Sequence, residues 1–93
     1  MNIDPTTGAE LPAPGTVTMY STTWCGFCKN LSRQLASLHI PVTVIDIEQN
    51  PAAASFIETV NGGNQTVPVI QFPDGQTLTN PSAATVQARL AGN

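Results

Sequence analysis

Two cysteines with two residues between them are the part of this sequence best suited to chemistry. Cys25 and Cys28 enclose Gly26-Phe27, and the chain has no other cysteine. Thiols this close interconvert between a disulfide and a dithiol, and the thiolate is the form that attacks another sulfur. A secreted disulfide scaffold typically carries about four to eight cysteines. A structural zinc site needs four ligands, and His39 is the one further nitrogen or sulfur donor. The pair is therefore interpreted as redox-active.

The two thiols are expected to be unequal. Cys25 directly follows a strand-like segment and begins a predicted helix, where unpaired N–H groups and the helix dipole favour an anionic sulfur and lower a thiol pKa. Cys28 lies one turn later, in an apolar stripe with Leu31, Leu35 and Leu38. We therefore predict Cys25, at an exposed rim, to be the attacking nucleophile. Cys28 is predicted to be the shielded, resolving thiol.

Side chains around the pair are candidates for substrate contact. Lys29 and Arg33 follow Cys25 by four and eight positions, on the side of the helix nearer Cys25, where they could stabilise a thiolate. The alternative for both is a solvated helix charge. Trp24 is expected to pack across the strand-to-helix junction. Phe27 is expected on the surface beside the thiols, as an apolar contact for a partner.

Length and charge limit what else the protein can be. The chain has 93 residues, enough for one compact domain, and a formal net charge of −3 with three basic residues. Three cations are too few for counterion release on a nucleic acid or for a polybasic membrane contact. Residues 1–15 are predicted to be a flexible arm and 16–93 a single domain. The first residues lack the basic start and apolar core of a signal peptide, so we expect a cytoplasmic protein.

The pattern along residues 16–93 predicts the element order β-α-β-α-β-β-α. Strands are expected at 16–21, 42–47, 67–72 and 76–78. Helices are expected from the cysteine pair to about 38, from 51 to 60 and from 81 to about 90, the last two with Asn-Pro at their starts. The first two strands should be parallel and the last two a hairpin. The apolar run at 42–47 predicts a central strand covered on both faces.

A proline marks the start of the third predicted strand. Pro68 interrupts a strand-like run from which it removes a hydrogen-bond donor. If the Val67–Pro68 bond is cis, the backbone of Val67 faces the cysteine loop. Its N–H and C=O are then available to a bound thiol or peptide. An ordinary trans proline at a strand edge is the alternative.

These features together resemble the thioredoxin superfamily: a strand, Cys-x-x-Cys at a helix start, a βαβ unit, and Thr66-Val67-Pro68 before a hairpin and a last helix. Length and order are similar to the glutaredoxins. Within these, residues 19–28, 61–68 and 74–82 are similar to the mycoredoxins, which use mycothiol in place of glutathione. The resemblance covers about residues 16–91. It implies an α/β thioredoxin-like glutaredoxin fold with a four-stranded mixed sheet and three helices.

The resemblance also implies an activity, the reduction of protein–mycothiol mixed disulfides by nucleophilic Cys25 with Cys28 as second thiol. Pro68 would be the cis-proline, and the thiol-binding residues would include Thr66, Val67, Thr79 and Asn80. No bound cofactor or metal is implied: mycothiol is a co-substrate, recycled by an NADPH-dependent mycothiol disulfide reductase, and the protein is expected to be a monomer. Residues 78–82 lack the acidic pair that usually closes a glutathione site, which favours mycothiol.

Two alternatives stay open at this point. One is a thioredoxin-like electron donor to ribonucleotide reductase, fed by thioredoxin reductase, although the usual Trp-Ser-Gly-Phe stretch is missing between Asp74 and Pro81. The other is an iron–sulfur-binding glutaredoxin. Residues 25–28 share three of four positions with the Cys-Gly-Phe-Ser motif of that class, and exposed thiolates can bind a cluster.

Overall fold

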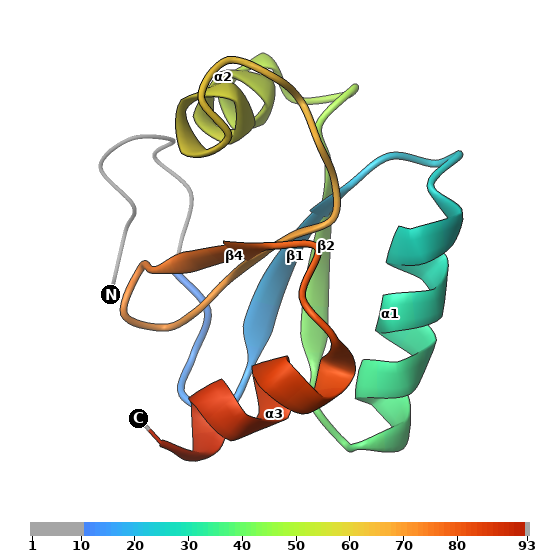
Figure 1. Ribbon diagram of the computed structural model, residues 1–93, viewed down its shortest axis with the longest axis vertical. Helices are drawn as coiled ribbons and strands as arrows, with labels where there is room; N and C mark the ends of the chain where they lie inside the picture. Colours follow the sequence, from blue (N-terminus) through green and yellow to red (C-terminus); the bar gives the residue numbers. More distant parts are fainter. Residues whose placement is uncertain (1–10, 93) are drawn as a thin grey trace.

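The computed structural model describes residues 11–92 and confirms the predicted fold class and element order (Figure 1). The elements are β1 (Val17–Ser21), α1 (Gly26–Ser37), β2 (Val42–Asp46), α2 (Pro51–Val60), β3 (Val69–Gln71), β4 (Thr77–Thr79) and α3 (Ala83–Ala91). Most of the predicted arm, residues 1–10, lies outside the described residues. Of the remainder, Pro12 is buried and the Ala13 carbonyl accepts a hydrogen bond from the Thr16 N–H at 3.0 Å.

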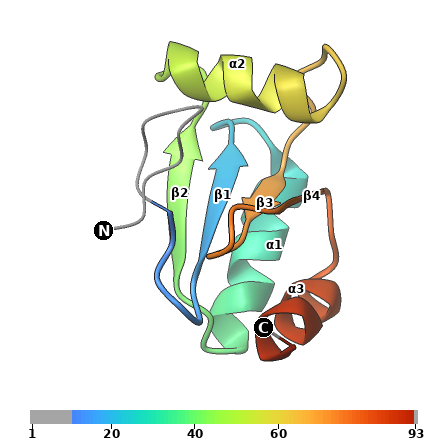
Figure 2. The ribbon, with the colours of Figure 1, turned by 90° about the vertical axis from the view of Figure 1, so that its left-hand side faces the viewer.

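The four strands form one mixed sheet in the order β2-β1-β3-β4 (Figure 2). β1 runs parallel to β2, with Val17 opposite Val42, and antiparallel to β3, with Met19 opposite Ile70. β3 and β4 form an antiparallel hairpin. The predicted parallel pair and hairpin are both confirmed, because the βαβ connection and the Pro73-Asp74-Gly75 turn determine strand direction locally.

The sheet separates two apolar clusters. Alternate residues of β1 face opposite sides: Val17 and Met19 pack with buried residues of α1 and α3, while Tyr20 packs with α2. On the α2 side, the Tyr20 and Phe56 ring centroids are 5.4 Å apart. The cluster on the α1 and α3 side contains Cys25 and Cys28. The cysteine pair is therefore buried within this hydrophobic cluster.

The prediction that residues 42–47 form a central, doubly covered strand is wrong. β2 lies at an edge of the sheet, and the Val44 side chain is 54% exposed. The central strand is β1, all five residues of which are buried, because it pairs with β2 on one side and β3 on the other. β-Branched residues suit an edge strand as well as a central one, so the apolar run alone could not distinguish the two.

Two helix starts show where local signals succeed and fail. α2 begins as predicted, with the Asn50 Oδ1 accepting from the Ala53 N–H at 3.1 Å. α3 begins at Ala83 rather than at Pro81, with Ser82 as its N-cap. The reason is that Asn80 still belongs to the hairpin: its N–H donates to the Pro68 carbonyl at 2.7 Å, and its φ is 51°.

Candidate active site

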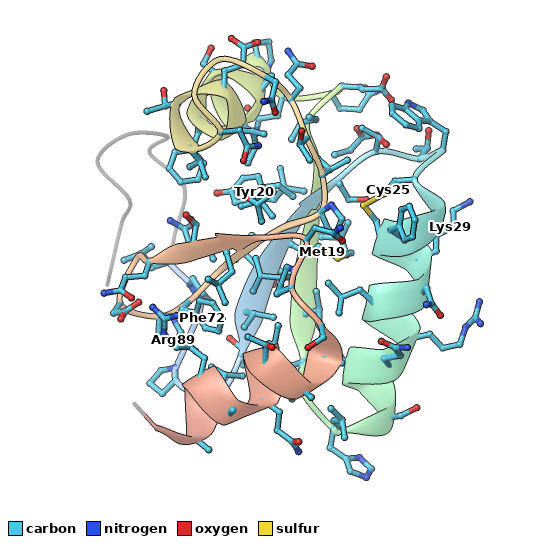
Figure 3. The ribbon with its side chains drawn as sticks, in the orientation of Figure 1. Met19, Tyr20, Cys25, Lys29, Phe72 and Arg89 are labelled. Carbon is cyan, nitrogen blue, oxygen red and sulfur yellow. A yellow bond between two sulfur atoms is a disulfide. The ribbon has the colours of Figure 1, made fainter. Side chains whose placement is uncertain are left out.

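The cysteine pair lies where β1 leads into the first turn of α1. Cys25 is the N-cap of α1 and forms a disulfide with Cys28, with the two Cα atoms 5.3 Å apart (Figure 3). The Cys28 N–H also donates a hydrogen bond to the Cys25 Sγ at 3.1 Å. No acidic residue lies in the first turn of α1. The Cys28 N–H thus donates to the Cys25 sulfur without a negative charge nearby in the first turn.

The exposure of the two cysteines differs less than predicted. Cys25 is 5% exposed and Cys28 is fully buried. The direction of the inequality is as expected, but the exposed rim predicted for Cys25 is wrong for this disulfide form. Cys25 is bonded to Cys28 and lies with it in the same apolar cluster.

Two large aromatic side chains beside the pair lie on the surface. Phe27 is 73% exposed, as predicted for a residue between the two thiols. Trp24 is 71% exposed, so the expectation that it packs across the strand-to-helix junction is wrong. Its indole Nε1–H instead donates to a Glu48 carboxylate oxygen at 3.2 Å, which holds the ring outside the core. Both rings are accessible to a protein that approaches the disulfide.

Lys29 lines a cavity beside the cysteine pair, whereas its side chain was predicted to lie near the Cys25 thiolate. Figure 3 shows its side chain extending outward from α1 rather than across the disulfide. With Cys28 and Asp46, Lys29 lines a cavity of about 350 Å³ between α1, the end of β1 and β2. Arg33, one helical turn further on, is exposed and does not line this cavity.

The Val67–Pro68 peptide bond is cis, as the resemblance to the glutaredoxins implied. The half-buried Val67 side chain packs against both apolar clusters, including the one that contains Cys25 and Cys28. Among residues 11–92, no hydrogen bond uses the backbone N–H or C=O of Val67. These backbone groups are therefore free to pair with a ligand.

Sequence reasoning missed Asn61, which joins two of the predicted thiol-binding residues. The Thr79 hydroxyl donates to the Asn61 Oδ1 at 2.7 Å, and the Asn61 Nδ2 donates to the Thr66 carbonyl at 3.0 Å. The Asn64 Oδ1 accepts from both the N–H and the hydroxyl of Thr66. The sequence places Asn61 in the 61–68 stretch that resembles the mycoredoxins, but no local pattern assigns its side chain a partner.

Asn61→Ala is expected to loosen the segment that leads to Val67. The substitution removes both hydrogen bonds, so we expect the free energy of unfolding to fall by about 1 kcal/mol. Amide exchange at Thr66, whose N–H donates to the Asn64 Oδ1, should accelerate. Asn61→Asp keeps the acceptor for Thr79 and should have the smaller effect. Urea unfolding and hydrogen exchange measure both, with the exposed Asn30→Ala as control. Unchanged exchange at Thr66 in Asn61→Ala would show that the bonds do not hold this segment.

Within residues 11–92, no three His, Cys, Asp or Glu side chains are grouped so that they could hold a metal ion. Nor do these residues include a helix with the length and apolar character needed to span a bilayer.

This chain is similar to known proteins both in sequence and in fold. A family model described as Glutaredoxin matches residues 17–77. The Mycobacterium tuberculosis protein Rv3198A, whose name places it among the glutaredoxins, is 53% identical over 74 residues, covering 80% of this chain and 88% of that protein. Mycoredoxin 1 of Corynebacterium glutamicum is 38% identical over 74 residues, covering 80% of this chain and 91% of its own.

Two solved structures show the same architecture at low sequence identity. A glutaredoxin from Archaeoglobus fulgidus matches with a TM-score of 0.63 at 21% identity, covering 77% of this chain and 82% of that one. Oxidised mitochondrial thioredoxin 3 from Saccharomyces cerevisiae matches with a TM-score of 0.58 at 20% identity, covering 84% and 77%. At this identity the likeness concerns the fold alone.

Proposed function

The chain belongs to the glutaredoxin family of thiol–disulfide oxidoreductases, and from this premise we propose that it removes mycothiol from protein–mycothiol mixed disulfides. The observation that carries the proposal is the Cys25 sulfur at the N-terminus of α1, where it accepts the Cys28 N–H. The 38% identity to Mycoredoxin 1 supports mycothiol as the small thiol. So does the absence of a carboxylate between Leu78 and Ser82.

The first step requires Cys25 as a thiolate. The Cys25 sulfur caps α1 in the disulfide form. A thiolate that keeps this place in the dithiol form would be stabilised by the helix dipole and by the Cys28 N–H. We therefore expect the pKa of the Cys25 thiol to lie below its ordinary value. The thiolate attacks the mycothiol sulfur of the mixed disulfide. A Cys25–mycothiol disulfide forms, the bond to the substrate protein breaks, and that protein leaves as a thiolate that takes a proton from water.

Two routes return Cys25 to the thiolate. A second mycothiol, as thiolate, attacks the sulfur of the bound mycothiol, and mycothiol disulfide leaves while Cys25 regains its electron pair. Alternatively, Cys28 attacks the Cys25 sulfur and expels mycothiol as a thiolate. The second route ends in the Cys25–Cys28 disulfide. That disulfide needs two further reducing equivalents, so we propose it as a side path or as the route for dithiol substrates.

Substrate binding is assigned to groups around the pair. The unpaired N–H and C=O of Val67 would bond an amide of the thiol in strand fashion. Thr66, Thr79 and Asn80, held near Val67 by the Asn61 and Pro68 hydrogen bonds, would line the same region. Trp24 and Phe27 would contact the protein part of the substrate. Lys29 remains a predicted contact, although it extends away from the disulfide.

The proposed reaction takes its electrons from outside the protein. Glutaredoxin chemistry needs no bound cofactor, and the electrons would come from NADPH through a mycothiol disulfide reductase. A thiol-based cycle of this kind works in a reducing compartment, and we propose the cytoplasm. The step needs one chain, so a monomer suffices.

The test is NADPH consumption with a mycothiolated substrate, in the presence of mycothiol and its disulfide reductase. We expect a rate about tenfold or more above that with a glutathionylated substrate, glutathione and glutathione reductase. A reaction without this protein measures the uncatalysed exchange. Equal rates with the two thiols would contradict the mycothiol assignment. Fast reduction by thioredoxin reductase without a small thiol would instead favour an electron donor of the thioredoxin type.

A further inference from the structure

A buried hydroxyl beside the cysteine pair has no hydrogen-bond partner. Thr22 lies between β1 and α1 and is 5% exposed. Among the side chains of residues 11–92, its Oγ1 is the buried polar atom left without a hydrogen bond. Leaving a hydroxyl unpaired in a protein interior costs about 1–3 kcal/mol. A valine of the same shape would avoid this cost, so the hydroxyl calls for an explanation.

Thr22 is fixed close to both cysteines. Its carbonyl accepts the Cys25 N–H at 3.3 Å, and Thr22 and Cys28 are both among the residues that line the 350 Å³ cavity. Cys25 does not line this cavity, and its sulfur accepts the Cys28 N–H. Of the two cysteines, Cys28 is thus the one that borders the same cavity as Thr22.

None of the polar groups that line the cavity, Thr23 and Ser32 included, forms a hydrogen bond with the Thr22 hydroxyl. The Ser21 hydroxyl donates to the Thr22 carbonyl at 3.1 Å rather than to its side chain. An Asp46 carboxylate oxygen accepts the Glu48 N–H at 2.9 Å. The Lys29 ammonium extends into solvent. The neighbouring group whose hydrogen bonding changes when the disulfide is reduced is therefore the Cys28 sulfur.

We propose that the Thr22 hydroxyl is the hydrogen-bond partner of the Cys28 sulfur in the dithiol form of the protein. A disulfide sulfur is a poor acceptor and has no proton to donate, whereas a thiol donates weakly and a thiolate accepts strongly. Reduction breaks the S–S bond with two electrons and two protons from a dithiol reductant, which leaves as a disulfide. Thr22 is unpaired before this step and paired after it, so it is a positioning residue that favours the reduced state.

This inference rests only on the thiol–disulfide half of the proposed function and is independent of mycothiol. Thr22→Val removes the hydroxyl at nearly constant shape. We expect the oxidised protein to become more stable and the reduced protein less stable, two changes of opposite sign. The equilibrium with a reference dithiol should shift about tenfold toward the protein disulfide, equivalent to about 30 mV.

The experiment equilibrates the full chain with mixtures of oxidised and reduced dithiothreitol and measures the oxidised fraction by alkylation and mass spectrometry. Urea unfolding is recorded for each redox form. In a Cys25→Ser background, thiolate absorbance against pH should show a higher pKa for Cys28 when Thr22 is replaced by valine. Thr23→Val is the matched control, because Thr23 is exposed, adjacent in sequence and lines the same cavity.

Each outcome decides the question. A tenfold shift in Thr22→Val with an unchanged equilibrium in Thr23→Val supports the proposal. An equal change in stability of both redox forms, or the same shift in Thr23→Val, overturns it. If Thr22→Val does not fold, the Thr22→Ser and Thr22→Ala pair differs in the hydroxyl alone and must show the same shift. None of these measurements uses mycothiol, so failure of the mycothiol assay would leave the result intact.

Discussion

Cys25→Ser is expected to abolish the release of mycothiol from a mixed disulfide, while Cys28→Ser retains it. A serine hydroxyl at the N-cap of α1 stays protonated and does not attack sulfur, so the rate should fall about a thousandfold or more. In Cys28→Ser the thiolate of Cys25 and the second mycothiol complete the cycle, and we expect a rate within roughly threefold of the unmodified protein. Steady-state rates with a mycothiolated peptide measure both.

The two variants control for each other. Both lack the disulfide between Cys25 and Cys28, so any effect of losing the cross-link is common to them. A difference in activity then reports the different roles of the two sulfurs. Activity that is lost in Cys28→Ser but kept in Cys25→Ser would reverse the assignment of nucleophile and resolving thiol.

Leu35→Ala is expected to have the largest effect on stability. Leu35 is fully buried in the cluster that contains both cysteines, and it holds α1 against the sheet. Truncating a buried leucine costs about 2–5 kcal/mol, a large share of the roughly 5–15 kcal/mol that stabilises a typical domain. We therefore expect urea unfolding of the oxidised protein at a clearly lower midpoint.

The control for this substitution is Gln34→Ala, one residue earlier on the exposed side of the same helix. Its effect should stay within about 0.5 kcal/mol, because an exposed side chain loses little packing. A Leu35→Ala loss as small as that of the control would mean that α1 does not pack against β1 and α3 through this side chain.

Local signals in the sequence were sufficient for the element order. Asn50-Pro51 determines a helix start through a cap and a fixed φ, and Pro73-Asp74-Gly75 determines a tight turn, each within a few residues. The spacing of the two cysteines likewise predicted their place at the start of α1. These features depend on neighbours in the chain, which a sequence displays directly.

Features that depend on distant residues were harder to predict. β2 lies at the edge because β3, far along the chain, pairs with the other side of β1. Trp24 is exposed because its indole bonds Glu48, 24 residues away. Asn80 does not cap α3 as predicted, because its N–H donates to the Pro68 carbonyl. In each case a partner that no local pattern reveals decided the outcome, and the role of Asn61 was missed for the same reason.

The position of Val67 between the two apolar clusters has a consequence for how this protein could diverge. Its side chain packs against the α2 cluster as well as the cluster of the cysteines. A change of volume in this α2 cluster is therefore expected to move the backbone that is proposed to receive the thiol. Selection could adjust the affinity for one small thiol over another through the interior of the protein, while every residue in contact with that thiol stays the same.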